Sequence, residues 1–158
     1  MTAKEFLAKA RYINQNIQTT QECIERLLYP HPQQPTERGK SSVRENREID
    51  KRIRLAAMQV DLQRELTRLM KYKEVIAKIA SNPEVSNLSR VLLKRRYILG
   101  EDWRRIARYL DYETSYVRKE LFNEAIREIE PFSAMWSEFD ADNNDEKRDN
   151  TDVISEDV

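Results

Sequence analysis

Apolar side chains recur at helical spacing along most of this chain, and this spacing restricts it to long amphipathic helices. In residues 2–29 the apolar positions alternate steps of four and three, with Thr20 as a polar intrusion, and they are Phe6, Ala10, Ile13, Ile17, Ile24 and Leu27. This is the a/d pattern of a coiled-coil seam. Thr2 followed by Glu5 is a capping box, which predicts that the helix begins there.

A second long helix is predicted over residues 47–80. Its apolar positions shift register near Val60, and they are Ile49, Ile53, Ala56, Val60, Leu62, Leu66, Leu69, Ile76 and Ile79. Asn82-Pro83 predicts its end, because a residue before proline avoids the helical region. Residues 30–46 contain Pro30, Pro32, Pro35 and Gly39, so we expect a flexible connector there.

Neither long helix is expected to be stable alone, because each carries an apolar stripe that must be buried. The connector lets the chain reverse, so residues 1–80 are predicted to form a helical hairpin that also supports oligomerisation. The stripes bury on each other or on a second subunit. We expect a homo-oligomer, with a dimer favoured.

The charge is unevenly distributed although the chain as a whole is neutral. Residues 1–80 hold 16 Lys or Arg and 10 Asp or Glu, whereas residues 130–158 hold 2 and 10. A basic body with an acidic tail indicates binding to a polyanion, although solvated charges on ordinary helices are an equally good interpretation. Residues 130–158 are predicted to be a largely disordered tail, with an aromatic patch at Phe132, Trp136 and Phe139.

Several classes of protein are not expected. No run of 18 apolar residues and no signal-peptide core are present, so we expect a cytoplasmic protein. The chain has one cysteine, Cys23, and one histidine, His31, and it has no Gly-rich phosphate loop or nucleophile–base pair. The acidic tail lacks the glycine and the final glutamate of a calcium loop. We therefore predict no enzyme activity, no metal site and no cofactor.

Residues 84–129 are predicted to form a compact unit of three helices. Asp102 is a suitable N-cap for a helix that starts at Trp103. Asp111, Tyr112 and Glu113 then separate Leu110 from the next helix, and so short a turn requires a sharp helix–helix crossing. Asp111 occupies the turn position where the left-handed region is needed, which Asp tolerates. This pattern predicts a helix-turn-helix at residues 88–129. Its apolar positions are Leu88, Leu92, Tyr97, Trp103, Ile106, Ala107, Leu110, Val117, Leu121, Ala125 and Ile129.

These residues carry a resemblance to a known family. The series Tyr97, Gly100, Trp103, Ile106, Ala107, Leu110, Asp111 and Tyr112, followed by Val117, resembles the region-4 helix-turn-helix of sigma-70-type factors. Residues 1–130 also resemble small proteins encoded by phages and prophages of Gram-positive bacteria, which are grouped with the ArpU and RinA late-gene transcription regulators. The chain departs from that pattern at Asp111, where the family has glycine, and in its acidic tail.

The resemblance implies that the chain binds double-stranded DNA in a bacterial host cell. In this motif the start of the second helix contacts base edges. The expected base-reading residues are Thr114, Ser115, Tyr116, Arg118, Lys119 and Asn123. Arginine side chains on the flanking helices suit phosphate contacts. These are Arg95, Arg96, Arg104, Arg105 and Arg108.

The preferred hypothesis is an all-α transcription regulator of phage or prophage origin that activates late genes, with host RNA polymerase as a possible partner. Two alternatives stay open at this point. One is the small terminase subunit of viral DNA packaging, which also joins a helix-turn-helix to oligomerising helices. The other is an adaptor that binds RNA polymerase and has no DNA specificity of its own. A packaging protein should form large rings, whereas a transcription regulator should be a monomer, dimer or tetramer. A salt-dependent affinity for DNA would count against the adaptor.

Overall fold

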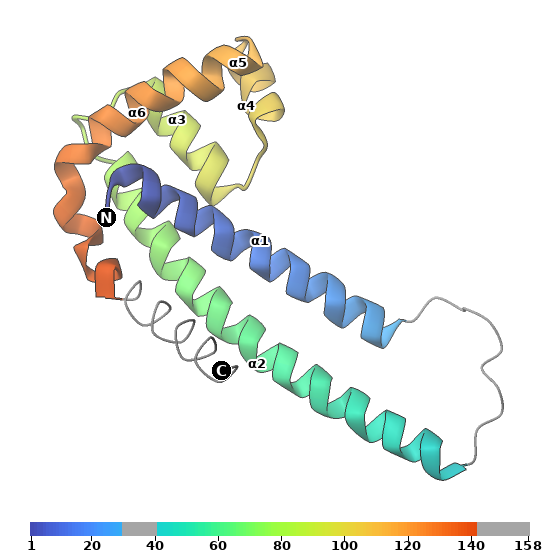
Figure 1. Cartoon of the computed structure of the whole chain (residues 1–158). Coiled ribbons are helices and arrows are strands. Elements are labelled where there is room, and N and C mark those ends of the chain that lie inside the picture. Colours follow the sequence, from blue (N-terminus) through green and yellow to red (C-terminus); the bar gives the residue numbers. More distant parts are fainter. Residues whose placement is uncertain (30–40, 142–158) are drawn as a thin grey trace, which may run out of the picture. The chain divides into compact units, whose positions relative to one another are not determined.

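The computed structural model describes residues 1–29 and 41–141, and every element in these ranges is a helix. The prediction of an all-helical protein is therefore confirmed for the described residues. The elements follow the chain in Figure 1 as α1 Ala3–Leu28, α2 Ser41–Ala80, α3 Asn87–Leu93, η1 Lys94–Ile98, α4 Trp103–Leu110, α5 Thr114–Tyr116, η2 Val117–Leu121, α6 Phe122–Ile129 and η3 Glu130–Phe139.

Contacts divide the chain into two compact units. Of the described residues, unit 1 contains 1–11 and 72–141, and unit 2 contains 12–29 and 41–71. Each of the two long helices therefore contributes to both units. This division differs from the expected one, in which all of residues 1–80 were grouped, because the first turns of α1 and the last turns of α2 pack with the C-terminal helices.

The start of α1 has the predicted capping box. The Thr2 backbone N–H donates to Glu5 Oε2 at 2.7 Å, and the Glu5 backbone N–H donates to Thr2 Oγ1 at 3.3 Å. These two bonds satisfy amide groups that have no partner inside the helix. The hydrogen bond from the Thr2 amide also lowers the pKa of the Glu5 carboxyl.

The second long helix begins earlier than predicted. Residues 41–46 belong to α2, so the part of the expected connector from residue 41 onward is wrong. The physical reason is that the helix-breaking residues end at Gly39, and residues 41–46 contain neither proline nor glycine. The connector's remaining residues, 30–40, lie outside the described ranges. At its other end α2 stops at Ala80, just before Asn82-Pro83, as predicted.

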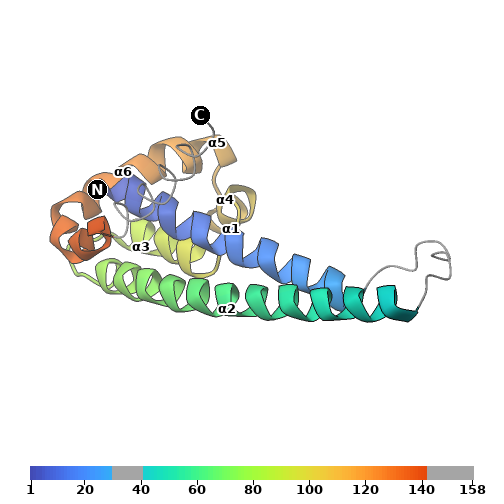
Figure 2. The same cartoon turned by 60° about the horizontal axis from the view of Figure 1, so that its bottom comes forward.

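In unit 2, residues 12–28 of α1 and 41–71 of α2 lie side by side in both cartoon views (Figures 1 and 2). Ile13, Ile17 and Leu69 are buried, and Leu55 and Leu62 are half-buried. Ile49, Ile53 and Val60 are exposed, although the sequence placed them on the same stripe as the buried residues. The register shift near Val60 therefore marks two separate stripes rather than one shifted stripe.

In unit 1 the segment after Pro131 packs into an aromatic cluster, which we define as Phe6, Tyr72, Trp136 and Phe139. The Phe6 ring stacks on Tyr72 and on Trp136, with centroids 5.2 Å and 5.3 Å apart. Tyr72 and Phe139 are closer, at 4.3 Å. Trp136 is 1% exposed. Two members of the aromatic patch noted in the sequence, Trp136 and Phe139, are thus part of the core of unit 1, whereas Phe132 is half-buried.

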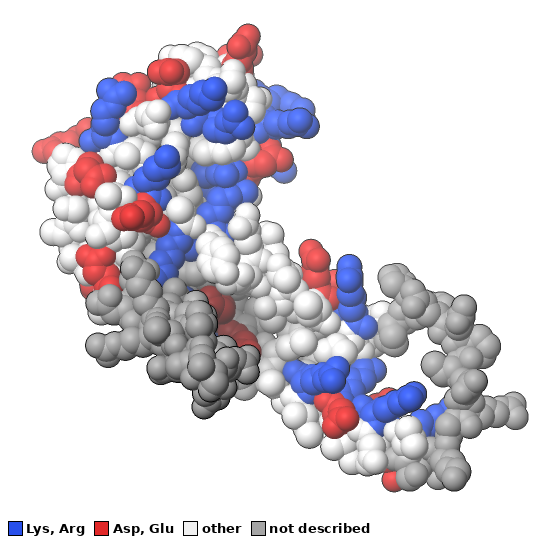
Figure 3. Space-filling model, viewed as in Figure 1, with Lys and Arg blue, Asp and Glu red and all other residues white. Residues whose placement is uncertain are grey.

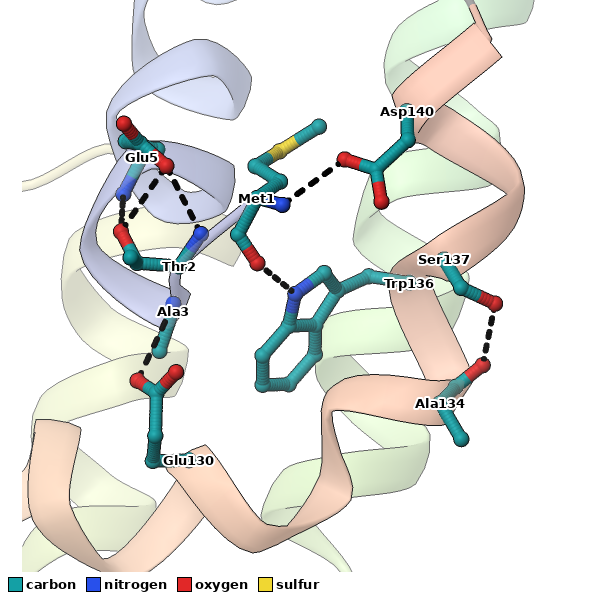
Figure 4. A network of polar contacts seen from close by, with 9 residues as sticks. All are labelled: Met1, Thr2, Ala3, Glu5, Glu130, Ala134, Trp136, Ser137 and Asp140. Atoms are coloured by element: carbon teal, nitrogen blue, oxygen red, sulfur yellow. Dashed lines mark hydrogen bonds and ion pairs between the residues drawn. The ribbon is translucent and has the colours of Figure 1, made fainter.

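Polar contacts hold the same segment against the start of the chain (Figure 4). Trp136 Nε1 donates to the Met1 carbonyl at 3.0 Å, and the Ala3 amide donates to Glu130 Oε2 at 3.1 Å. The N-terminal ammonium also lies 3.0 Å from Asp140 Oδ1. The expectation of a tail from residue 130 is therefore wrong for residues 130–141, because large apolar side chains there find a partner in α1 and α2. The remainder of the expected tail, residues 142–158, lies outside the described ranges.

Unit 1 also contains two longer rods, each made of successive helical elements that include a π-helical stretch. The helix of α3 and η1 runs over residues 87–98, and α5, η2 and α6 run without a break over residues 114–129. The junction residues Lys94, Val117 and Phe122 all keep right-handed helical angles. Asp102 Oδ1 caps α4 by accepting from the Arg105 amide at 2.8 Å, so the predicted cap is confirmed.

Asp111 ends α4 in the left-handed conformation, with φ 61° and ψ 44°. Its amide donates to the Ala107 carbonyl. The prediction that this aspartate adopts the left-handed region is confirmed. A β-branched residue pays about 1–2 kcal/mol to adopt this region, whereas glycine adopts it freely.

We therefore expect Asp111→Val to lower the free energy of unfolding by about 1–2 kcal/mol, and Asp111→Gly to change it by less than about 0.5 kcal/mol. Urea denaturation of the two variants and the parent measures the difference. Equal stability of the valine and glycine variants would contradict the role given to this turn.

Candidate nucleic-acid interface

One small core is shared by α3, α4 and the rod that starts at Thr114. Its buried members are Leu92, Ile106, Ala107, Val117 and Leu121, and Leu88, Trp103, Leu110 and Phe122 pack against it. The Trp103 and Phe122 rings meet edge to face at 5.3 Å. Ile106, Val117 and Leu121 are buried as predicted, whereas Trp103 and Leu110 are only half-buried.

Burial of Val117 and Leu121 fixes which side of the second rod faces outward. Arg118, Lys119 and Asn123 are exposed, as are Ser115 and Tyr116, and Thr114 is half-buried. The structure thus places five of the six expected base-reading side chains at the surface, all within the first ten residues of the rod. Lys and Arg side chains also lie over the part of the molecule that carries α3–α6, with acidic side chains between and around them (Figure 3).

A surface hollow lies beside α4. It has a volume of about 610 Å³ and is lined by Arg95, Asp102, Arg104, Arg105, Arg108 and Tyr109. Four of its six lining residues are arginines, and all four are among the five arginines expected to contact phosphate. Arg104, Arg105 and Arg108 are exposed and come from the single helix α4. We call these six residues the basic hollow.

Arg95 is held in a fixed position in the basic hollow. Its Nη1 atom lies 2.9 Å and 3.1 Å from the two oxygens of Glu101, and its guanidinium carbon lies 3.2 Å from the centre of the Tyr109 ring. Interaction with Tyr109, followed by that with Glu101, raises the pKa of Arg95. Glu101 also lies 3.5 Å from Arg105 Nε. The Glu101 carboxylate therefore forms ion pairs with both Arg95 and Arg105.

Arg96 differs from the other expected phosphate contacts because it does not line the basic hollow. It is half-buried, its guanidinium carbon lies 4.3 Å from the Trp103 ring centre, and its Nη1 donates to the Glu101 carbonyl at 3.2 Å. Burial, and to a lesser extent the charge of Arg11, lower the pKa of Arg96. These contacts give Arg96 a packing role between η1 and α4.

Sequence reasoning missed three residues of this site, Glu101, Asp102 as a lining residue, and Tyr109. The spacing of Glu101 and Arg105, four residues apart, was a usable signal for their ion pair. Tyr109 contacts Arg95 across 14 positions of sequence, and no local pattern indicates that contact. Two more exposed tyrosines, Tyr112 and Tyr116, face each other at 5.5 Å beside the turn.

Comparison with protein-family models, with curated proteins and with solved structures found no match for this chain. The site is therefore interpreted from its own chemistry. Among the described residues, no helix is long and apolar enough to cross a membrane, and no group of His, Cys, Asp and Glu has the arrangement of a metal site.

Proposed function

We propose that residues 88–129 form a helix-turn-helix that binds double-stranded DNA in a sequence-specific manner, and that the protein is a transcription regulator. The observation that carries this proposal is the turn at Asp111. A left-handed residue joins α4 to a rod whose first ten residues expose Arg118, Lys119 and Asn123. In a helix-turn-helix this second helix enters the major groove.

The chemistry of the side chains supports two kinds of contact at the interface, one with the bases and one with the phosphates. Arginine and lysine suit the O6 and N7 atoms of guanine, and asparagine suits adenine, so Arg118, Lys119 and Asn123 are the proposed base readers. The exposed arginines of the basic hollow lie on α4, the helix that crosses the DNA backbone in this motif. Arg104, Arg105 and Arg108 are therefore the proposed phosphate contacts.

The resemblance of residues 1–130 to phage and prophage late-gene regulators supports a more specific role in transcription. The proposed regulator belongs to phages or prophages, activates late genes in the cytoplasm of a bacterial host, and contacts host RNA polymerase. Mapping of the DNA bound by the full chain in a host cell during phage induction tests this extension. Bound sites next to late promoters are the expected result, and sites spread without relation to promoters would contradict it.

The first DNA-binding prediction concerns base readout. A duplex is first selected from a random library by the full chain. We expect Arg118→Ala and Lys119→Ala each to weaken binding to this duplex by about 1–3 kcal/mol, and to reduce its advantage over random duplex. Arg127→Ala is the matched control, because Arg127 is exposed on the same rod but lies nine residues beyond Arg118. Fluorescence anisotropy measures all affinities. If the Arg118 and Lys119 variants discriminate as the parent does, the reading face is wrongly assigned.

The second DNA-binding prediction concerns phosphate. Arg104→Ala and Arg108→Ala should weaken binding to selected and random duplexes alike, and each should reduce the slope of log K against log salt by about 1. Arg108→Lys is the control, because it retains the charge and should retain the slope. A loss confined to the selected duplex would place these arginines at bases instead.

A further inference from the structure

The α2 helix carries a second apolar stripe that nothing covers among the described residues. Its large members are Ile49, Ile53, Val60 and Met70, which are 52%, 62%, 59% and 70% exposed. Ala56 belongs to the same series and is also exposed. We call these five residues the outer stripe. Steps of four, three and four connect Ile49, Ile53, Ala56 and Val60, which is the spacing of a coiled-coil seam.

The outer stripe lies on the face of α2 opposite to the buried one. We define the outer heptad series as the seven positions at this spacing, all exposed, which are Ile49, Ile53, Ala56, Val60, Gln63, Thr67 and Met70. Leu55, Leu62 and Leu69 are half-buried or buried, and each follows a residue of this series by two positions. Two residues correspond to about 200° around a helix. The series extends over about 32 Å at 1.5 Å per residue.

We propose that the outer stripe is a homodimer interface, in which α2 of one subunit packs antiparallel against α2 of a second copy. A two-fold interface brings the same surface of both subunits together, so a single stripe supplies both halves. With the two-fold axis near Met58, Val60 lies level with Ala56 of the partner subunit. In the same register Ile53 lies level with Gln63 of the partner subunit, and Ile49 lies level with Thr67 of the partner subunit. The inference concerns unit 2 alone and does not rest on the proposed DNA binding.

Charges beside the stripe favour the antiparallel orientation. With Ile53 at position a and Ile49 and Gln63 at position d of the heptad, Asp50 and Arg64 both occupy position e. Both side chains are exposed. In the antiparallel pair Asp50 lies opposite Arg64 of the partner subunit, and the symmetry repeats this pair. A parallel pair would instead place Glu45 beside Asp50 of the partner subunit, which is a like-charge contact. Within its own chain, Arg64 Nη1 lies 4.0 Å from Asp61 Oδ1, and both side chains are exposed.

Sedimentation velocity of the full chain tests the interface. We expect a dimer at micromolar concentration, and we expect Ile53→Glu with Val60→Glu to weaken it at least about 100-fold, because each subunit would bury two charges in the seam. Far-ultraviolet circular dichroism should be unchanged, since both side chains are exposed in the single subunit. Leu99→Glu is the control, because Leu99 is 64% exposed and lies outside the stripe.

Two further measurements test the orientation. Asp50→Arg should weaken the dimer about tenfold, and the added substitution Arg64→Asp should restore it. Spin labels at Arg47→Cys, in a Cys23→Ser background, should lie about 33 Å apart along the helix axis in the antiparallel dimer. Labels at the same level, separated only by the width of the helix pair, would overturn the antiparallel orientation.

Three results would overturn the interface itself. One is a chain that stays monomeric at every micromolar concentration. Another is a dimer that Ile53→Glu with Val60→Glu leaves intact. The third is a monomer that dimerises only after residues 142–158 are deleted, since that result would assign the outer stripe to the chain's own C-terminal segment.

Discussion

Ile106→Ala should lower the free energy of unfolding of unit 1 by about 2–5 kcal/mol. Ile106 is completely buried in the core that joins α4 to the rod starting at Thr114. Its truncation removes apolar contacts and leaves a cavity between two helices that meet across a three-residue turn. A loss of this size is a large part of the total stability of a small domain. The variant should therefore also lose the proposed DNA binding at temperatures where the parent stays folded.

Urea denaturation followed by circular dichroism measures this effect. Leu99→Ala is the matched control, because Leu99 is an exposed aliphatic residue of the same unit, and its truncation should change stability by less than about 0.5 kcal/mol. If Ile106→Ala unfolds at the same urea concentration as the parent, α4 does not pack on the second rod as described.

Trp136→Ala is expected to have an equally large effect, about 3–5 kcal/mol. The indole is 1% exposed, stacks on Phe6 and donates a hydrogen bond to the Met1 carbonyl. Removing it opens the aromatic cluster and leaves that carbonyl without its donor. Because Phe6 and Tyr72 belong to the two long helices, the loss should extend to the ends of α1 and α2 in unit 1.

Urea denaturation of this variant measures the effect. Unfolding is followed by the intrinsic fluorescence of Trp103 and by circular dichroism. Tyr12→Ala is the control, because Tyr12 is an aromatic residue of α1 that is 63% exposed. We expect its stability to stay within about 0.5 kcal/mol of the parent. If Trp136→Ala were as stable as Tyr12→Ala, residues 130–141 would not be part of the folded core.

Local chemistry explains which features were predictable from the sequence. Thr2 with Glu5, Asp102 and Asp111 each act within a few residues of their own position, as two caps and a left-handed turn. Such motifs depend on backbone geometry that a short segment sets by itself. The helices and the core residues Ile106, Val117 and Leu121 follow in the same way from helical periodicity.

Features that depend on distant partners were not predictable. Trp136 and Phe139 were placed in an acidic tail, because their partners Phe6 and Tyr72 are more than 60 residues away in the sequence. Periodicity also merged two opposite stripes of α2 into one, since both have the same helical spacing. Arg96 was grouped with exposed arginines, because nothing in the sequence indicates that its guanidinium lies over Trp103.

Selection of DNA by the full chain from a random duplex library is the direct test of sequence-specific DNA binding. We expect one duplex sequence to be enriched, and we expect it to bind at least about 1,000-fold more tightly than random duplex at physiological salt. We also expect this affinity to fall as salt rises, because phosphate contacts release counterions. A library that stays random after repeated selection, with no binding to any duplex even at low salt, would show that the helix-turn-helix is not a DNA-binding unit.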